Sequence, residues 1–294
     1  ETLPEKGHFF LAENVRFLPG ETTGSTDLAK KMANTSDVFI MDAFASAHRQ
    51  HTSTYGVLKE IKHHFLGPLF VLEWEQLTKA THQAKTPVVS IVGGSKVSSK
   101  IGLLHAILAK SNTLILGGGI ANTFLAAKGH KVGHSLYEPD WTKQATSLIE
   151  TAKREGKSIL LPSDVWVENT AGKIRLCALD QVQADDAILD VGTVTQQKIH
   201  KTLAQAKTIY WNGPLGCFER EAFAQGTMAL AHSVAESRAY SLAGGGDTVS
   251  AIEHAGVLDQ ISFVSTGGGA FLTFLESGSL PIMDYLTKKQ QGTT

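Results

Sequence analysis

The chain has 294 residues, of which 42% are hydrophobic and 19% are charged, as in an ordinary globular protein of one or two domains. Its 27 basic and 28 acidic residues give a net charge of −1, which excludes a global basic field that recruits nucleic acid or an anionic membrane. Its two cysteines, Cys177 and Cys217, fit a reducing cytosol better than a disulfide framework, and no apolar run approaches the roughly 18 residues that span a bilayer.

The first part of the chain contains few regular elements. Short apolar runs at 9–11 and 38–41 predict strands, and the pattern between them predicts a helix near 27–33. His63-His64 is interpreted as the solvated end of a helix. These elements are too few to close an α/β domain, so we expect this lobe to be incomplete.

The rest of the chain begins with a helical stretch at 69–84, which we interpret as a helix joining two domains. Beyond it, short apolar runs alternate with helical patterns. Strands are predicted at 87–92, 113–116, 158–161, 187–191, 208–211, 240–243 and 263–265, and helices at 96–109, 117–124, 141–155 and 195–206. This alternation indicates a parallel sheet covered on both faces, while residues 173–176 predict half of an antiparallel hairpin.

Four of the predicted strands end in glycine clusters, at 93–94, 117–119, 244–246 and 267–269. One cluster alone would more often be a tight turn than a binding loop. Four of them at the carboxyl ends of strands suggest a surface that brings bare backbone against a polyphosphate. The connections from helix to strand lack such clusters, which supports this hypothesis.

Two common nucleotide motifs are absent. Residues 156–158 imitate the end of a P-loop, but Thr151 replaces its first glycine and the segment precedes a strand. After Gly117 and Gly119, Asn122 occupies the third position of a G-x-G-x-x-G pattern. A dinucleotide enzyme such as a dehydrogenase is therefore disfavoured.

Lys96 and Lys100 follow the first glycine cluster. Their spacing of four predicts that both ammonium groups lie on one face of a helix, within its first turns. Most lysine pairs on helices are simply solvated. Positive charges at a helix start oppose its dipole, however, so we favour a role in binding phosphate.

Asp247 follows three glycines at the predicted start of a helix, where it could cap the helix, bind Mg²⁺, or do both. Asn212-Gly213-Pro214 predicts a rigid turn at a strand end, and Glu219 follows seven residues after Asn212. The alternative for this last segment is an ordinary turn followed by a surface acid.

Arg16 and Arg49 each lie near a predicted strand end in the first part of the chain. A single arginine is usually a surface residue, but two in a domain that faces a phosphate-binding domain favour an anion site. The nearby Asp42 and His48 are interpreted mainly as structural residues that satisfy backbone groups of their loop.

At these residues the chain resembles phosphoglycerate kinase over essentially its full length. The matching blocks are ENVRF, DAFASAHR, IVGGSKVSSKI, LILGGGIANTFL, IYWNGPLGCFE, GGGDT and STGGGA, in the order and spacing of the family. The resemblance implies an α/β kinase with two Rossmann-like lobes, parallel sheets and a hinge helix. It would transfer a phosphoryl group between 1,3-bisphosphoglycerate and ADP with Mg²⁺, in glycolysis and gluconeogenesis.

The resemblance also assigns roles to individual residues. Arg16 and Arg49 would bind phosphoglycerate, and Asp247 would hold Mg²⁺. The implied nucleotide-binding residues are Gly93, Gly94, Lys96, Gly117, Gly118, Asn212, Pro214, Glu219, Gly246, Asp247 and Thr248, and the implied catalytic residues are Lys96, Lys100 and Gly268. We accordingly expect ATP or ADP and Mg²⁺ as cofactors, small-molecule partners, no nucleic acid or membrane, and a cytoplasmic monomer.

The implied domains divide the chain into four parts. These are the remainder of the substrate lobe at 1–68, the linker helix at 69–84, the nucleotide-binding lobe at 85–277, and a C-terminal segment at 278–294 that returns to the first lobe.

The main departure from the family is the absence of its opening Asp-x-Asn and His-Leu-Gly-Arg blocks, which supply further substrate contacts. We therefore expect the protein in the cell to be longer, and the chain alone to have almost no kinase activity. The alternative function is that of a fragment that binds nucleotide without turnover.

Overall fold

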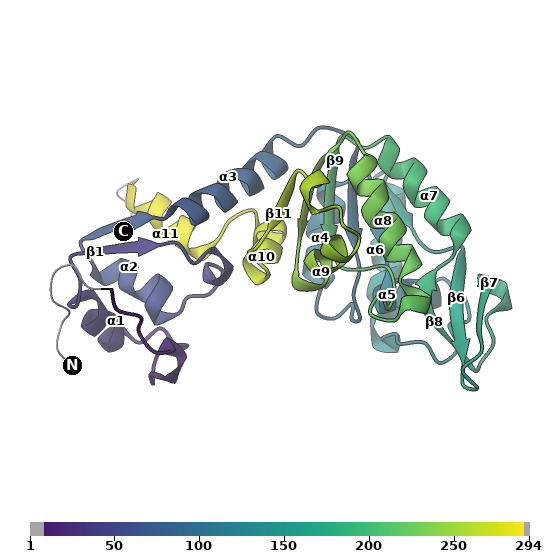
Figure 1. The fold of residues 1–294 in the computed structure, drawn as a ribbon, viewed down its shortest axis with the longest axis horizontal. Helices are drawn as coiled ribbons and strands as arrows, with labels where there is room; N and C mark the ends of the chain where they lie inside the picture. Colours follow the sequence, from purple (N-terminus) through teal and green to yellow (C-terminus); the bar gives the residue numbers. More distant parts are fainter. Residues whose placement is uncertain (1–8, 291–294) are drawn as a thin grey trace. The chain divides into compact units, whose positions relative to one another are not determined.

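The computed structural model describes residues 9–290, which fall into two compact units (Figure 1). The first unit contains the described residues up to Gln76 together with those from Gly269 onwards, and the second runs from Leu77 to Gly268. The helix α3 (Pro68–His82) includes residues of both units. The predicted helix at 69–84 is therefore present, and each unit is described separately below.

The described part of the first unit contains a parallel pair of strands, β1 (Val38–Met41) and β2 (His63–Leu66). Its other helices are α1 (Thr26–Ala33), α2 (Val57–Glu60), α10 (Gly269–Ser277) and α11 (Pro281–Gln290), with single turns at Val15–Phe17, Phe44–Ser46 and Thr52–Gly56. The helix α11 lies against this unit through Tyr285, whose ring packs edge-on against Tyr55 at a centroid distance of 5.8 Å.

The predicted strand at 9–11 is wrong, because these residues form neither helix nor strand in the structure. A strand needs a neighbour to pair with its backbone, and in the described residues β1 pairs with β2 alone. The side chains of Phe9 and Leu11 are fully exposed. His63 and His64 also differ from expectation, since they begin β2 instead of ending a helix.

Asp42 has the structural role expected from the sequence. Its Oδ1 accepts a hydrogen bond from the backbone N–H of Phe70 at 2.9 Å, in the first turn of α3. This carboxylate satisfies one of the donors that a helix leaves unpaired at its N-terminus. The ring of Phe70 is fully buried and meets Phe44 edge-on, so the same turn is held by packing.

The second unit contains, within the described residues, a parallel six-stranded sheet in the order β11-β10-β9-β3-β4-β5. Its strands are β3 (Val88–Val92), β4 (Thr113–Leu116), β5 (Ser158–Leu160), β9 (Thr208–Asn212), β10 (Tyr240–Gly244) and β11 (Phe263–Ser265). All residues of β3 and β9 are buried, as expected for central strands covered on both faces. The predicted α/β fold with parallel sheets is confirmed.

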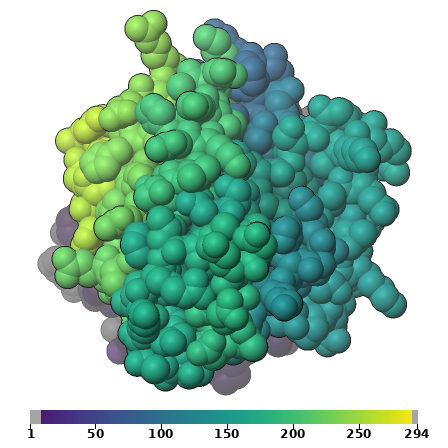
Figure 2. Space-filling view, turned by 90° about the vertical axis from the view of Figure 1, so that its right-hand side faces the viewer, coloured from purple at the N-terminus to yellow at the C-terminus, as the bar shows by residue number. Residues whose placement is uncertain are grey.

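The helices of this unit are α4 (Ile101–Lys110), α5 (Gly118–Ala127), α6 (Thr142–Arg154), α7 (Thr193–Ala204), α8 (Gln225–Glu236) and α9 (Gly246–His254). An antiparallel sheet, β7-β6-β8, is built from β6 (Asp164–Asn169), β7 (Ile174–Ala178) and β8 (Asp186–Val191). Figure 2 shows one face of the second unit in a space-filling view, with its residues coloured teal and green. The hairpin prediction at 173–176 is confirmed, but the strand at 187–191 belongs to this small sheet and not to the parallel one.

No helix among the described residues is both long enough and apolar enough to cross a membrane.

Asp190, near the end of β8, ties this strand to the start of α8. Its two carboxylate oxygens accept hydrogen bonds from the backbone N–H groups of Val191, at 2.8 Å, and Gly226, at 2.7 Å. Burial raises the pKa of the carboxyl group to about 7, and the two N–H donors oppose that shift. The folded protein therefore holds a proton that the unfolded chain releases near pH 4.

This proton makes stability depend on pH. Between about pH 4 and 7 the folded state binds more protons at Asp190 than the unfolded state, so the contribution of Asp190 falls as pH rises and is constant above about 7. We expect the unfolding free energy of the wild type to decline, relative to that of Asp190→Asn, by a few kcal/mol across this window. Urea unfolding at a series of pH values measures the difference, and parallel curves for the two proteins would contradict the assignment.

Candidate functional site

The candidate site lies where the strand order of the large sheet reverses. After β3 the chain adds β4 and β5 on one side, and it later returns to add β9, β10 and β11 on the other. The loops that follow β3 and β9 therefore leave the sheet in opposite directions, and parallel α/β sheets bind ligands at such a point. Both loops carry residues that the sequence singled out, including Gly93, Lys100 and Asn212.

Backbone packing explains most of the glycines at this edge. A Cβ atom on Gly93 would lie 1.8 Å from the carbonyl oxygen of Pro214, and one on Gly117 would lie 2.6 Å from Cα of Leu215. Gly213, whose φ is +97°, faces the carbonyl of Gly93 in the same way. Packing between the loops therefore already requires glycine at these positions. Their part in binding a polyphosphate stays a prediction.

Hydrogen bonds join the same loops. Gly118 N–H donates to the carbonyl of Leu215 at 2.9 Å, and Ile120 N–H donates to the carbonyl of Gly94 at 3.1 Å. By contrast, a Cβ atom on Gly246 or Gly268 would meet nothing within 4 Å beyond its own chain neighbours in the described residues. These two glycines, at the starts of α9 and α10, leave open space in which a ligand could approach the backbone.

Lys100 is bonded to both loops at the reversal point. Its Nζ donates to the carbonyl oxygen of Gly93 and to Oδ1 of Asn212, each at 2.7 Å. Burial lowers the pKa of this ammonium group, and the negative charge of Asp247 acts in the opposite direction. The site thus contains a partly buried cation that is held in place by two oxygens.

The predicted helical face for Lys96 and Lys100 is wrong, because α4 begins only at Ile101. Lys100 is the residue before the helix, and Lys96 lies exposed in the preceding loop. Glu138 holds this loop, since its carboxylate accepts from the backbone N–H of Ser98 at 2.8 Å and from its hydroxyl at 2.6 Å. The side chain of Val97 is fully buried, which further anchors this loop.

Asn212 and Thr248 continue the network toward β10 and α9. Nδ2 of Asn212 donates to the carbonyl of Gly244 at 2.7 Å, and the hydroxyl of Thr248 accepts from Gly213 N–H at 2.7 Å. Both side chains are buried, Thr248 completely. These two residues therefore fix the shape of the site, whatever they contribute to a ligand.

Asp247 is exposed in the first turn of α9, beside the network. It does not cap the helix, because the capping position is Gly245, with a φ of +103°. Of the two roles considered from the sequence, the capping role is wrong, and the metal-binding role stays a prediction. Glu219 is also exposed, and Pro214 is half-buried in the loop between Asn212 and Glu219.

The arginines of the first unit are both exposed. Arg16 lies in the turn Val15–Phe17, which the side chain of Asn14 caps. Nε of Arg49 donates to Nε2 of His48 at 3.2 Å. Burial lowers the pKa of His48, and the charge of Arg49 lowers it further, so the imidazole is held neutral and able to accept this bond.

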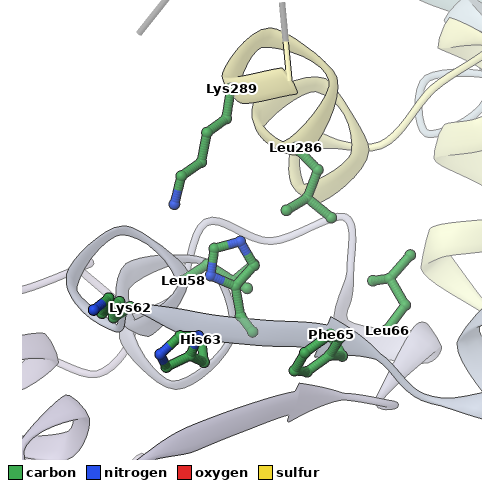
Figure 3. Close-up of a pocket in the computed structure, with 8 residues that line it drawn as sticks. Leu58, Lys62, His63, Phe65, Leu66, Leu286 and Lys289 are labelled. Atoms are coloured by element: carbon green, nitrogen blue, oxygen red, sulfur yellow. The ribbon is translucent and has the colours of Figure 1, made fainter. Parts of the chain in front are cut away.

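A cavity of about 470 Å³ lies elsewhere in the first unit, between β2 and α11 (Figure 3). Its lining includes Lys62, His63, His64 and Lys289, and neither Arg16 nor Arg49 contributes to it. Burial lowers the pKa of His64, as does the charge of Lys289. The cavity is therefore separate from the residues that the sequence assigns to an acidic substrate.

Sequence reasoning missed several residues that shape the site. Glu138 acts on a loop 40 residues earlier, and Asn122 donates from Nδ2 to the carbonyl of Leu136 at 3.1 Å. The side chain of Leu136 is 59% exposed beside Gly119. No local pattern in the sequence indicates contacts between residues so far apart in the chain.

Comparison with known proteins identifies the family of the chain. A family model described as phosphoglycerate kinase matches residues 2–278. The phosphoglycerate kinases of Francisella tularensis subsp. novicida and Coxiella burnetii are each 49% identical to the chain over 288 residues, which cover 96% and 97% of the chain and 73% and 74% of those relatives. The chain belongs to the phosphoglycerate kinase family.

Solved structures of phosphoglycerate kinases share the fold. The enzyme from Coxiella burnetii gives a TM-score of 0.88 at 49% identity, over 94% of this chain and 72% of that one. The enzyme from Pyrococcus horikoshii gives 0.82 at 29% identity, over 95% and 72%. Membership of the phosphoglycerate kinase family makes the chain a kinase, a transferase of glycolysis.

The two kinds of glycine predict different defects. Gly93→Ala forces a side-chain carbon into the carbonyl of Pro214, so we expect it to destabilise the second unit by about 1–3 kcal/mol or more. Gly246→Ala adds its methyl group to open space, so it should leave the unfolding midpoint unchanged and weaken nucleotide binding alone. Urea unfolding and calorimetry on both variants separate the cases, and equal stability of the two would refute the role of packing at Gly93.

Proposed function

We propose that the reaction that this chain serves is the transfer of a phosphoryl group between 1,3-bisphosphoglycerate and ADP, and in reverse between 3-phosphoglycerate and ATP. Family membership supports the reaction. The observation that carries the proposal is the ammonium group of Lys100, fixed between Gly93 and Asn212 at the point where the sheet order reverses. Phosphoryl transfer requires positioned cations more than covalent help, and this group is positioned before any substrate arrives.

The nucleotide would bind along the carboxyl edge of the large sheet. Gly246 leaves the N-terminus of α9 accessible, and backbone N–H groups at a helix start attract phosphate oxygens. Lys96 is exposed on the adjacent loop and adds a positive charge. The exposed carboxylate of Glu219 would accept hydrogen bonds from ribose hydroxyls, and the exposed side chain of Leu136 would offer an apolar surface to a base.

Mg²⁺ fits the residues present. The described residues contain no cluster of three histidine, cysteine or acidic side chains that could hold a metal without help. Mg²⁺ that accompanies a nucleotide needs only one or two carboxylates, since the phosphates and water supply its other ligands. The exposed carboxylate of Asp247 would hold it, and the ion would neutralise charge on the phosphates.

The phosphoglycerate would bind to the first unit through Arg16 and Arg49. Both guanidinium groups are exposed, and their planar forks match carboxylate and phosphate oxygens. The hydrogen bond from Nε of Arg49 to His48 leaves its other N–H groups available. Gly268, with its open surroundings, would allow the transferring group to approach the backbone.

A second candidate function is nucleotide binding without turnover. It is favoured by the second unit, whose sheet and loop network are formed by its own residues. For either function we expect a cytoplasmic monomer with small-molecule partners. A coupled assay with 3-phosphoglycerate and ATP on residues 1–294 decides between them: turnover supports the kinase, and nucleotide binding without turnover supports the alternative.

Asp247→Ala tests the metal role. We expect the variant to bind ADP less tightly when Mg²⁺ is present and almost normally when it is removed by a chelator, because the lost carboxylate contacts the metal and not the nucleotide. Calorimetry with and without Mg²⁺ measures this. The matched control is Asp259→Ala, an exposed acid on another turn, and an equal loss in both variants would exclude a metal role for Asp247.

Lys100→Ala tests catalysis in any form of the protein that turns over. A cation that stabilises the transferring group in the transition state affects kcat much more than nucleotide affinity. We expect a loss of about 2.7–4 kcal/mol in transition-state stabilisation, by analogy with one oxyanion-hole donor. Lys143→Ala, which removes an exposed lysine of α6, is the control. Unchanged kcat with a raised KM would assign Lys100 to binding only.

A further inference from the structure

A second basic cavity of about 410 Å³ lies at the opposite, amino-terminal edge of the large sheet. Its lining comes from the last turn of α3 and the segment after it, and from the residues that begin β9 and β10. The nine described residues that line it are Lys79, Ala80, Gln83, Ala84, Lys85, Lys207, Thr208, Arg238 and Tyr240. All of them belong to the second unit.

The cavity collects positive charge without a balancing acid. Four of the nine lining residues are lysine or arginine, and none is aspartate or glutamate. None of these four cations belongs to an ion pair of the described residues. Lys79 does lie over the ring of Tyr240, with Nζ 5.3 Å from the ring centroid. Four like charges around one hollow repel each other, so a structural explanation must supply negative charge from elsewhere.

Helix dipoles supply part of that charge. Lys79 is in the last turn of α3, Lys207 follows the end of α7, and Arg238 follows the end of α8. Each helix C-terminus carries a partial negative charge, so these termini favour nearby cations without neutralising them. The lining therefore keeps a net positive charge, which an anion would offset.

The backbone that carries the cations is fixed before any ligand binds. The hydroxyl of Thr208 accepts a hydrogen bond from the backbone N–H of Lys85 and donates one to the carbonyl of Lys85, each at 3.0 Å. Tyr210 donates its phenolic hydrogen to the carbonyl of Ala80 at 2.6 Å, and Tyr240 N–H donates to the carbonyl of Lys207 at 3.0 Å. These bonds join α3, β9 and β10 around the cavity, and such preorganisation lowers the entropic cost of binding.

The cavity is distinct from the candidate nucleotide site. Lys207 and Thr208 precede or begin β9, whereas Asn212 ends it. A strand of this length separates its ends by roughly 13 Å, at about 3.3 Å per residue. A ligand at one edge of the sheet therefore cannot contact the cations at the other edge unless it is much longer than a nucleotide phosphate.

We propose that this cavity binds a small soluble anion that carries two or more negative charges on phosphate groups. The guanidinium fork of Arg238 and the point charges of three lysines are the donor types that bind phosphate oxygens. The volume of the cavity falls within the range of small-molecule sites. A compact metabolite therefore fits inside it, whereas the surface of a macromolecule does not.

Lysine acetylation read by mass spectrometry tests the proposal, with inorganic pyrophosphate as the ligand and sodium chloride at matched ionic strength as the blank. We expect pyrophosphate to slow acetylation of Lys79, Lys85 and Lys207. Lys131 and Lys143, which are exposed lysines of the same unit, should react at the same rate with and without it. Because each lysine reports its own position, binding of pyrophosphate near Lys96 and Lys100 does not obscure the result.

Variants of Arg238 sharpen the test, since this exposed side chain can be changed without opening the core. Arg238→Ala should raise the pyrophosphate concentration for half-protection by about tenfold, as hydrogen bonds to charged groups are worth that much or more. Arg238→Lys should restore part of the protection. The proposal is overturned if pyrophosphate protects Lys131 and Lys143 equally, protects no lysine of the cavity, or acts alike on the wild type and Arg238→Ala.

Discussion

The hydrogen bonds of Lys100 are the contacts on which the rest of the candidate site depends. A buried ammonium group is costly unless oxygens surround it, and here the carbonyl of Gly93 and the side chain of Asn212 both accept from it at 2.7 Å. Asn212 then donates to Gly244, so one cation links the ends of β3, β9 and β10. In the proposed reaction, the charge that fixes these loops would also act on the transferring phosphoryl group.

Topology explains why this network forms where it does. The reversal of strand order places β3 beside β9, although more than a hundred residues separate them in the chain. Their loops then meet so closely that Gly93 and Gly213 have no room for a side chain. Close approach of two backbones sets the positions of Lys100 and Asn212, and α9 adds Asp247 at the margin. Packing of the loops therefore requires glycine at Gly93 and Gly213, whereas the proposed ligand would use the open space at Gly246.

Much of the fold could be predicted from the sequence, because alternating apolar runs and glycine turns are local signals. The strand at 38–41 and the hairpin at 173–176 were predicted where the structure has them. The failures arise from non-local contacts. Glu138 holds Ser98 and keeps Lys96 out of a helix, and residues 9–11 lack a pairing strand in the described chain. Neither effect leaves a trace in a short window of sequence.

The candidate site follows the same division. The sequence correctly predicted that Lys100, Asn212 and Asp247 lie at the same carboxyl edge of the large sheet, because each follows a predicted strand. The sequence could not show that Thr248 is buried and bonded to Gly213, or that Asp247 has no capping role. The roles of Arg16 and Arg49 stay predictions, because the chemistry of an exposed guanidinium is defined only by what binds to it.

The most direct measurement is a crystal structure of the protein with ADP and Mg²⁺. We expect the phosphates to lie at the carboxyl edge of the large sheet, with the nearest phosphate oxygen in hydrogen-bonding range of Lys96 or Lys100 and the metal at Asp247. A nucleotide found at the amino-terminal edge, or one that leaves Lys100 bonded only to Gly93 and Asn212 with its phosphates elsewhere, would contradict the proposed role of this edge.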